Sequence, residues 1–246
     1  MKTINIFSIL LFNLFFSDLT FAQLPDPGFK IDHRTAIVIT DPQNDFLSKD
    51  GIAWGLVGQS VEKNNTIQNI ETLFKLAEKY NLPVFISPHL LYKHDNSWEF
   101  TGSMLTFAKS VGLMTKETPT KDHIGTGTAG ADIYNLYKKY VENGNVIITS
   151  PHKIFGPESN DLILQLRKHK IDKVILAGML SNLCTEAHLR ELVEQGFEVA
   201  VVKDATAAAI LPDMDGYEIA LANFLLISNH VFTTKELEEA FSATKF

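Results

Sequence analysis

The chain of 246 residues contains a single cysteine, Cys184. It therefore cannot form an internal disulfide, and its core must be stable without covalent cross-links. The chain also lacks an excess of basic residues, because 22 Lys and Arg stand against 29 Asp and Glu and give a net charge of −7. This balance, without basic clusters, argues against nucleic acids and anionic membranes as partners. With 45% hydrophobic residues, the chain can bury the core of a globular domain.

Long hydrophobic runs are also lacking, except at the N-terminus. Lys2 precedes a mostly apolar run from Ile4 to Phe16, and residues 20–22 resemble a small-x-small cleavage site. The run is shorter than the ~20 residues that a membrane span needs. We therefore expect residues 1–22 to be a signal peptide and residues 23–246 to form one domain. The mature protein is then expected to be secreted or periplasmic and not membrane-bound.

Strand and helix patterns alternate along the rest of the chain. Short apolar segments predict six buried strands, at 35–40, 82–87, 145–149, 173–177, 198–202 and 230–233. Helical periodicity predicts helices between and after them, at 60–80, 131–141, 160–170, 183–195, 216–226 and 235–241. This order predicts a three-layer α/β/α, Rossmann-like domain with a mostly parallel six-stranded sheet. Residues 90–130 fit no simple crossover.

Cys184 stands where the fourth predicted strand turns into a helix. A lone cysteine is often a small buried apolar residue. Nucleophiles of α/β enzymes, however, are placed at such strand-to-helix turns. Helix N-termini carry partial positive charge, so we expect this thiol to have a lowered pKa.

Two further polar residues follow the carboxyl ends of predicted strands, Asp41 after the first and Lys153 after the third. Ligands of open α/β sheets bind at this edge. An acid, an amine and a thiol that met there would form a nucleophilic site, with Asp41 accepting the proton of Cys184 and Lys153 keeping Asp41 ionised.

Three segments resemble the isochorismatase-like cysteine hydrolases, which include nicotinamidases and N-carbamoylsarcosine amidases. They are IVITDPQNDF at 37–46, SPHKIFGPESNDL at 150–162 and ILAGMLSNLCTEAHLRELVEQGFEVAVVKDATAA at 175–208. The resemblance implies the isochorismatase-like hydrolase fold and a catalytic triad of Asp41, Lys153 and Cys184. It also implies a non-proline cis peptide between Met179 and Leu180, and an oxyanion hole made by the backbone N–H groups of Leu180 and Cys184.

The segment after the second strand departs from the nicotinamidases that this family contains. Those enzymes carry an Asp-x-His and a further His that hold a metal, whereas this chain has only His89, His94 and Asp95 there. Because a metal site needs three or four convergent ligands, we expect neither a metal nor another cofactor. We interpret His89 as a substrate-contacting residue.

Aromatic residues near these motifs suggest how a substrate is held. Phe46 and Phe155 stand beside Asp41 and Lys153 and are expected to contact the substrate, with ordinary core packing as the alternative. Trp98 is expected to contact the substrate from a lid that also carries Tyr92, Phe100 and Phe107. The alternative for these aromatic residues is a contact between subunits, since we expect a homo-oligomer.

The sequence therefore predicts an exported cysteine hydrolase of a small non-peptide amide, acting through a thioester. Two alternatives remain open. One is a binding or partner module of the same fold with a redox-sensitive thiol. The other is hydrolysis of a vinyl ether, as in isochorismatase itself, which does not need the thiol.

Overall fold

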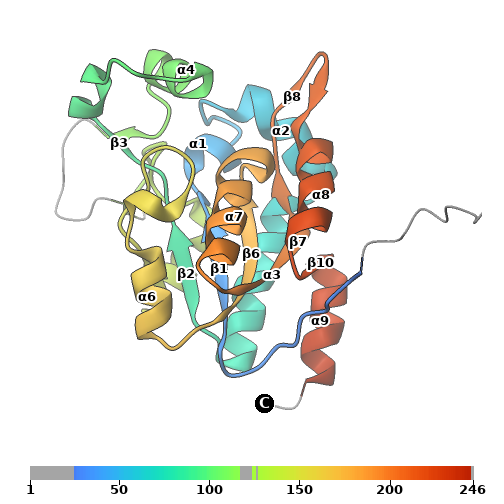
Figure 1. The fold of residues 1–246 in the computed structure, drawn as a ribbon. Helices are drawn as coiled ribbons and strands as arrows, with labels where there is room; N and C mark the ends of the chain where they lie inside the picture. The colour runs from blue at the N-terminus through green and yellow to red at the C-terminus, as the bar shows by residue number, and fades with distance from the viewer. Residues whose placement is uncertain (1–24, 117–123, 126, 245–246) are drawn as a thin grey trace, which may run out of the picture.

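The structure is a computed structural model that describes residues 25–116, 124–125 and 127–244. The expected signal peptide, residues 1–22, lies outside the described residues. A six-stranded sheet forms the centre of the molecule (Figure 1). Its strands are β1 (Thr35–Thr40), β2 (Val84–Ser87), β5 (Val146–Ile148), β6 (Lys173–Met179), β7 (Glu198–Ala207) and β10 (His230–Phe232).

The strands lie in the order β10-β7-β6-β1-β2-β5, and every neighbouring pair is parallel. The prediction of a mostly parallel six-stranded sheet is thus confirmed. From β1 the chain builds outward through β2 to β5, and then returns to β6 on the other side of β1. The strand order therefore reverses between β1 and β6.

Helices cover both faces of the sheet. Successive side chains of a strand point to opposite faces, so the apolar strands need a covering layer on each face. Ile37 and Ile39 of β1 pack in one core cluster with α3 (Thr66–Tyr80) and α9 (Thr234–Ala243). Ala36 and Val38 pack in a second cluster. The helices of that second cluster are α6 (Leu162–Lys168), α7 (Glu186–Glu194) and α8 (Gly216–Ile227), which lie in front of the sheet in Figure 1.

The predicted helix at 60–80 is two helices in the structure, α2 (Trp54–Lys63) and α3. Asn65 stands between them with a φ of 54°, in the left-handed region that asparagine tolerates better than most residues. The predicted helix at 131–141 is reduced to a short turn and α5 (Lys138–Glu142).

The remaining described elements are short. They comprise α1 (Asn44–Leu47), α4 (Ser103–Val111), the strand pair β3 (Leu91–Tyr92) and β4 (Thr115–Lys116), and the hairpin β8 (Ile210–Leu211) and β9 (Met214–Asp215). Single turns occupy 93–97, 135–137, 157–159 and 181–185. Figure 1 shows α4 and β3 at one end of the sheet. None of the helices in the described ranges has the length and apolar character of a membrane span.

Candidate active site

Four loops meet where β1, β2, β5 and β6 end. They carry Asp41, His89, His152 and Cys184, each within five residues of the end of its strand. Because β1 and β6 flank the point where strand order reverses, their carboxyl ends border the crevice in which α/β proteins bind ligands. An Asp41 carboxylate oxygen, a His152 ring nitrogen and Cys184 Sγ all lie within 4.8 Å of one another.

Asp41 is fully buried directly after β1. Its backbone has a φ of 46°, and its N–H donates to Ser87 O at 3.1 Å. Burial raises the pKa of its carboxyl group from 3.8 to about 6. Above that pH the group is ionised and can accept a proton.

Cys184 lies in the π-helical turn Ser181–Thr185 that precedes α7, and its thiol is buried. Burial, and then the charge of Asp41, raises the pKa of the thiol well above its usual value. Hydrogen bonding by the backbone of Leu180 and Cys184 acts on this pKa in the opposite direction. The expected lowering of this pKa is therefore wrong, because burial and the neighbouring carboxylate outweigh the start of the helix.

His152 forms the contact with Asp41 that the sequence interpretation assigned to Lys153. Its Nε2 lies 2.8 Å from Asp41 Oδ1, and the residue is fully buried. Burial lowers the pKa of His152 to about 3. A neutral imidazole thus donates a hydrogen bond to an ionised Asp41 at neutral pH, which holds the carboxylate in place.

Lys153 points elsewhere, so the predicted contact with Asp41 is wrong. Its Nζ bonds to Asp95 Oδ2 at 2.7 Å and to Leu90 O at 3.1 Å, and lies 3.6 Å from the centre of the Tyr92 ring. The reason is the extended backbone here, which pairs His152 with His89 in parallel. Consecutive side chains of an extended segment point to opposite sides, so only one of the two neighbours faces Asp41.

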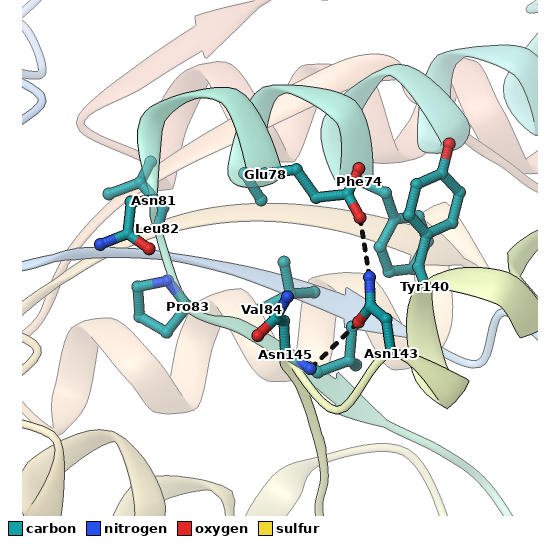
Figure 2. Close-up of a pocket in the computed structure, with 11 residues that line it drawn as sticks. Phe74, Glu78, Asn81, Leu82, Pro83, Val84, Tyr140, Asn143 and Asn145 are labelled. Atoms are coloured by element: carbon teal, nitrogen blue, oxygen red, sulfur yellow. Dashed lines mark hydrogen bonds between the residues drawn. The ribbon is translucent and has the colours of Figure 1, made fainter.

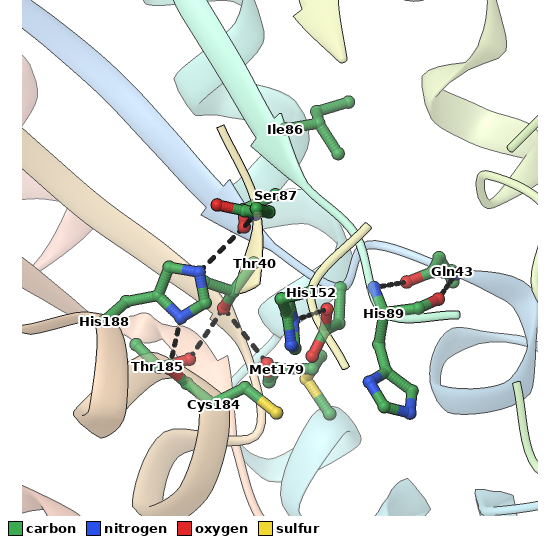
Figure 3. Close-up of polar contacts among 12 residues, drawn as sticks. Thr40, Gln43, Ile86, Ser87, His89, His152, Met179, Cys184, Thr185 and His188 are labelled. Carbon is green, nitrogen blue, oxygen red and sulfur yellow. Dashed lines mark hydrogen bonds and ion pairs between the residues drawn. The ribbon is translucent and has the colours of Figure 1, made fainter. Parts of the chain in front are cut away.

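His188 is a further buried residue that the sequence interpretation missed. Its Nδ1 contacts Cys184 O and its Nε2 contacts Ser87 Oγ, each at 2.7 Å (Figure 3). It therefore ties the cysteine turn to the end of β2. Its spacing of four residues from Cys184, which places both side chains on one helical face, was the available signal. The signal for His152 was its place beside Lys153 in the matched motif.

The turns on the two sides of the site are held against each other at Thr40, the last residue of β1. Its hydroxyl lies 3.0 Å from Met179 O and 2.9 Å from Thr185 Oγ (Figure 3). Gly178, opposite Thr40, has a φ of 113°, and a Cβ at this position would lie 2.1 Å from Thr40 O. The peptide bond between Met179 and Leu180 is cis, as predicted.

A small cavity of about 30 Å³ opens onto these groups. Its polar lining consists of Asp41, His89 and Cys184. The rest, called here the apolar wall, consists of Phe46, Met104, Leu105, Ala108, Leu113, Ile154, Phe155, Leu180 and Leu183. Phe46, His89 and Phe155 therefore lie where a substrate contact requires them.

The predicted aromatic lid differs from the wall that the structure forms. Trp98 is not part of the cavity lining, and its carbonyl oxygen accepts a hydrogen bond from Lys109 Nζ at 3.0 Å. Phe100 is 94% exposed. Aliphatic side chains of α4, together with Leu113, cover the cavity instead. The amphipathic pattern of α4 within residues 90–130 was the signal that the interpretation passed over.

Of the three residues considered for a metal, only two meet, with His94 Nε2 3.2 Å from Asp95 Oδ1. Asp95 accepts from Lys153 Nζ and from the N–H of Tyr92, while the His94 side chain is 78% exposed. His89 lines the cavity instead. These three residues therefore do not fit the ligand set of a nicotinamidase metal site.

A model of the isochorismatase domain family matches residues 35–236, so the chain belongs to this family of hydrolases. An uncharacterized isochorismatase family protein from Bacillus subtilis is 25% identical over 196 residues, covering 78% of this chain and 94% of the relative. A probable inactive nicotinamidase from Arabidopsis thaliana is 24% identical over 210 residues, covering 84% of this chain and 94% of that protein.

Solved structures share the fold. A cysteine hydrolase from Pseudomonas syringae pv. phaseolicola superposes with a TM-score of 0.71 at 20% identity, covering 89% of this chain and 98% of that chain. An N-carbamoylsarcosine amidase from Thermoplasma acidophilum superposes with a TM-score of 0.59 at 16% identity, covering 83% and 99%.

Proposed function

We propose that this protein hydrolyses a small non-peptide amide through a thioester on Cys184. The observation that carries the proposal is the buried cluster in which the Asp41 carboxylate, the His152 ring and Cys184 Sγ lie within 4.8 Å of one another beside a cavity. An acid and a thiol in contact are the parts that covalent acyl transfer needs. The hydrolases of this family provide the reaction class.

In the proposed first step, Asp41 takes the proton of Cys184 as Sγ attacks the carbonyl carbon. The thiol stays neutral until then, which agrees with its raised pKa. The developing oxyanion is held by the N–H groups of Leu180 and Cys184, which belong to the turn that carries the thiol. Asp41 then gives the proton to the leaving nitrogen, the C–N bond breaks, and an amine or ammonia departs.

In the second step, water attacks the thioester carbonyl while Asp41 accepts its proton. The C–S bond breaks, the thiol is protonated again and the carboxylic acid is released. His152 is a positioning residue in this scheme, because it touches Asp41 and is not among the residues that line the cavity. Lys153 has no step, because its ammonium group is bound to Asp95.

We also propose that the protein is exported, on the strength of its N-terminal sequence alone. Fractionation of cells that express the full chain tests this proposal. Protein that remains in the cytoplasm at full length would contradict it.

A second candidate is a binding module without turnover, which the name of the Arabidopsis relative favours. The buried thiol with a raised pKa does not favour a redox sensor, because such sensors use exposed thiolates. An intact acid and thiol in contact favour the enzyme.

A screen of the purified protein against small amides tests the proposal. Ammonia release is measured, and the intact mass reports an acyl group on Cys184. We expect turnover and an adduct with at least one amide, and neither with Cys184→Ala. Ligand binding without ammonia or adduct across the panel would favour the binding module.

A further inference from the structure

The cavity beside Cys184 is lined almost entirely by hydrocarbon. Nine of its twelve lining residues form the apolar wall, and only three supply polar side chains. Its volume of about 30 Å³ is room for one or two water molecules. An acyl group that enters must therefore replace the little water present and contact the aliphatic side chains of α4, such as Met104 and Leu105.

The charges around the cavity disfavour ionic substrates. Asp41 is the lining residue that is ionised at neutral pH, since burial lowers the pKa of His89 to about 4. The ammonium group of Lys153 is bound to Asp95 and Leu90 O. A substrate carboxylate would thus be buried without a cation and repelled by Asp41. A substrate ammonium group would lose its water against the apolar wall.

His89 adds one polar group that the proposed acyl transfer does not use. The residue is 8% exposed, and its Nδ1 has no hydrogen-bond partner among the described residues. Its backbone is fixed instead, because Gln43 accepts from His89 N at 2.9 Å and donates to His89 O at 2.8 Å. A buried imidazole held this way at the wall of the cavity is available to a ligand.

We propose that the substrate is a small uncharged amide with an apolar acyl group, and that the His89 imidazole binds its amide nitrogen. This inference rests on the proposed function and names the substrate class for the same site. The carbonyl oxygen is directed to the N–H groups of Leu180 and Cys184, the acyl group contacts the apolar wall, and the nitrogen faces His89 and Asp41.

Three amides with acyl chains of similar length test the acyl preference: butyramide, which is neutral, succinamate, which is anionic, and β-alaninamide, which is cationic. Ammonia release and the Cys184 adduct are measured for each. We expect kcat/KM for butyramide to exceed the other two by at least ~100-fold. Equal or faster turnover of a charged amide would overturn the inference while leaving the proposed function intact. No ammonia and no adduct from any amide would overturn both.

A cation placed in the wall should change this preference. Ile154 lines the cavity and is 40% exposed, so Ile154→Lys is compatible with the fold. We expect the ratio of kcat/KM for succinamate to that for butyramide to rise at least ~10-fold. Leu164→Lys is the matched control, because Leu164 lies on α6 away from the cavity and is 56% exposed. If this kcat/KM ratio were the same in Ile154→Lys and Leu164→Lys, the placement of the acyl group against the apolar wall would be wrong.

His89→Phe keeps a ring of similar shape and removes its nitrogens. We expect kcat/KM for butyramide to fall ~10- to 100-fold. p-Nitrophenyl butyrate has the same acyl group and no amide N–H. The rate at which it acylates Cys184 in His89→Phe should therefore stay within ~3-fold of the wild-type rate, because only the contact with the amide nitrogen is lost. A parallel fall with both substrates would mean that His89 only supports the structure.

Discussion

Two of the cavities in the described part of the chain lie at opposite ends of the sheet, and neither cysteine nor histidine lines the larger of these two. It measures about 450 Å³ and lies near the amino ends of β2 and β5, against α3 and α5 (Figure 2). Its carboxylate has a hydrogen-bond donor, because Asn143 donates to Glu78 at 2.8 Å and accepts from Asn145 N at 3.1 Å.

The cavity at the carboxyl ends is far smaller, at about 30 Å³. The buried nitrogens His89 Nδ1 and His152 Nδ1 nevertheless lack partners among the described residues. Their neighbour Asp41 has a strongly raised pKa. Strand direction and unsatisfied buried groups therefore identify the site in this protein, whereas empty volume does not.

The strongest test of this contrast is Cys184→Ala. We expect loss of turnover by at least ~10⁴-fold, because the nucleophile is gone. The unfolding free energy should change by only about 1 kcal/mol, because one small buried atom is removed. Ammonia release and chemical denaturation measure the two effects. A variant with near-normal rates would show that the thiol does not act covalently.

The second test compares two adjacent residues. His152→Leu, which fills a similar volume without a polar group, should lower kcat at least ~100-fold, because Asp41 loses its hydrogen-bond donor. Lys153→Met should keep kcat within ~10-fold and lower stability by about 1–3 kcal/mol, because buried Asp95 loses one of its hydrogen-bond donors. The reverse ranking in steady-state assays would restore the role that the sequence motif assigned to Lys153.

The pH profile gives the third test. Asp41 must be ionised to accept the proton, and its pKa of about 6 lies above the usual value, so activity should rise with pH through about 6. Below it, kcat/KM should fall about 10-fold per pH unit. His152, with a pKa of about 3, stays neutral over this range. In His152→Leu the acidic limb of the pH profile should move to higher pH, because the lost donor stabilises the ionised form of Asp41. A wild-type kcat/KM that begins to fall only near pH 4 would contradict the raised pKa of Asp41.

The smallest effect is expected at the larger cavity. Glu78→Gln should leave kcat/KM within ~2-fold and change stability by less than about 1 kcal/mol, because its hydrogen bond with Asn143 is at the surface. The same amide assay applies. A large loss of activity there would break the contrast between the two ends of the sheet.

The strands and the two chemical residues Asp41 and Cys184 could be predicted from the sequence, because apolar runs and the residues that end them are local signals. The partner of Asp41 could not be settled in this way. A shift of one residue in the extended segment after β5 exchanges His152 for Lys153, and only the pairing with His89 fixes which one faces inward.

The pKa of the thiol could not be predicted from the sequence either, because it depends on the fold. The start of a helix predicted an acidic thiol, but the pKa depends on how deeply Cys184 is buried and on Asp41, which is 143 positions away in the sequence. The position of α4, whose aliphatic side chains cover the cavity, could not be predicted either, because residues 90–130 follow no simple crossover pattern.

Gly178 sets the gap between the acid and the thiol by having no side chain. Thr40 and Gly178 are paired in neighbouring strands, and they precede Asp41 and the cysteine turn. Any Cβ at position 178 would press on the main chain of Thr40 and act as a spacer between β1 and β6. Even alanine at position 178 should therefore move the Asp41 carboxylate away from the Cys184 thiol. A single methyl group, far smaller than any substrate, would then prevent proton transfer between them.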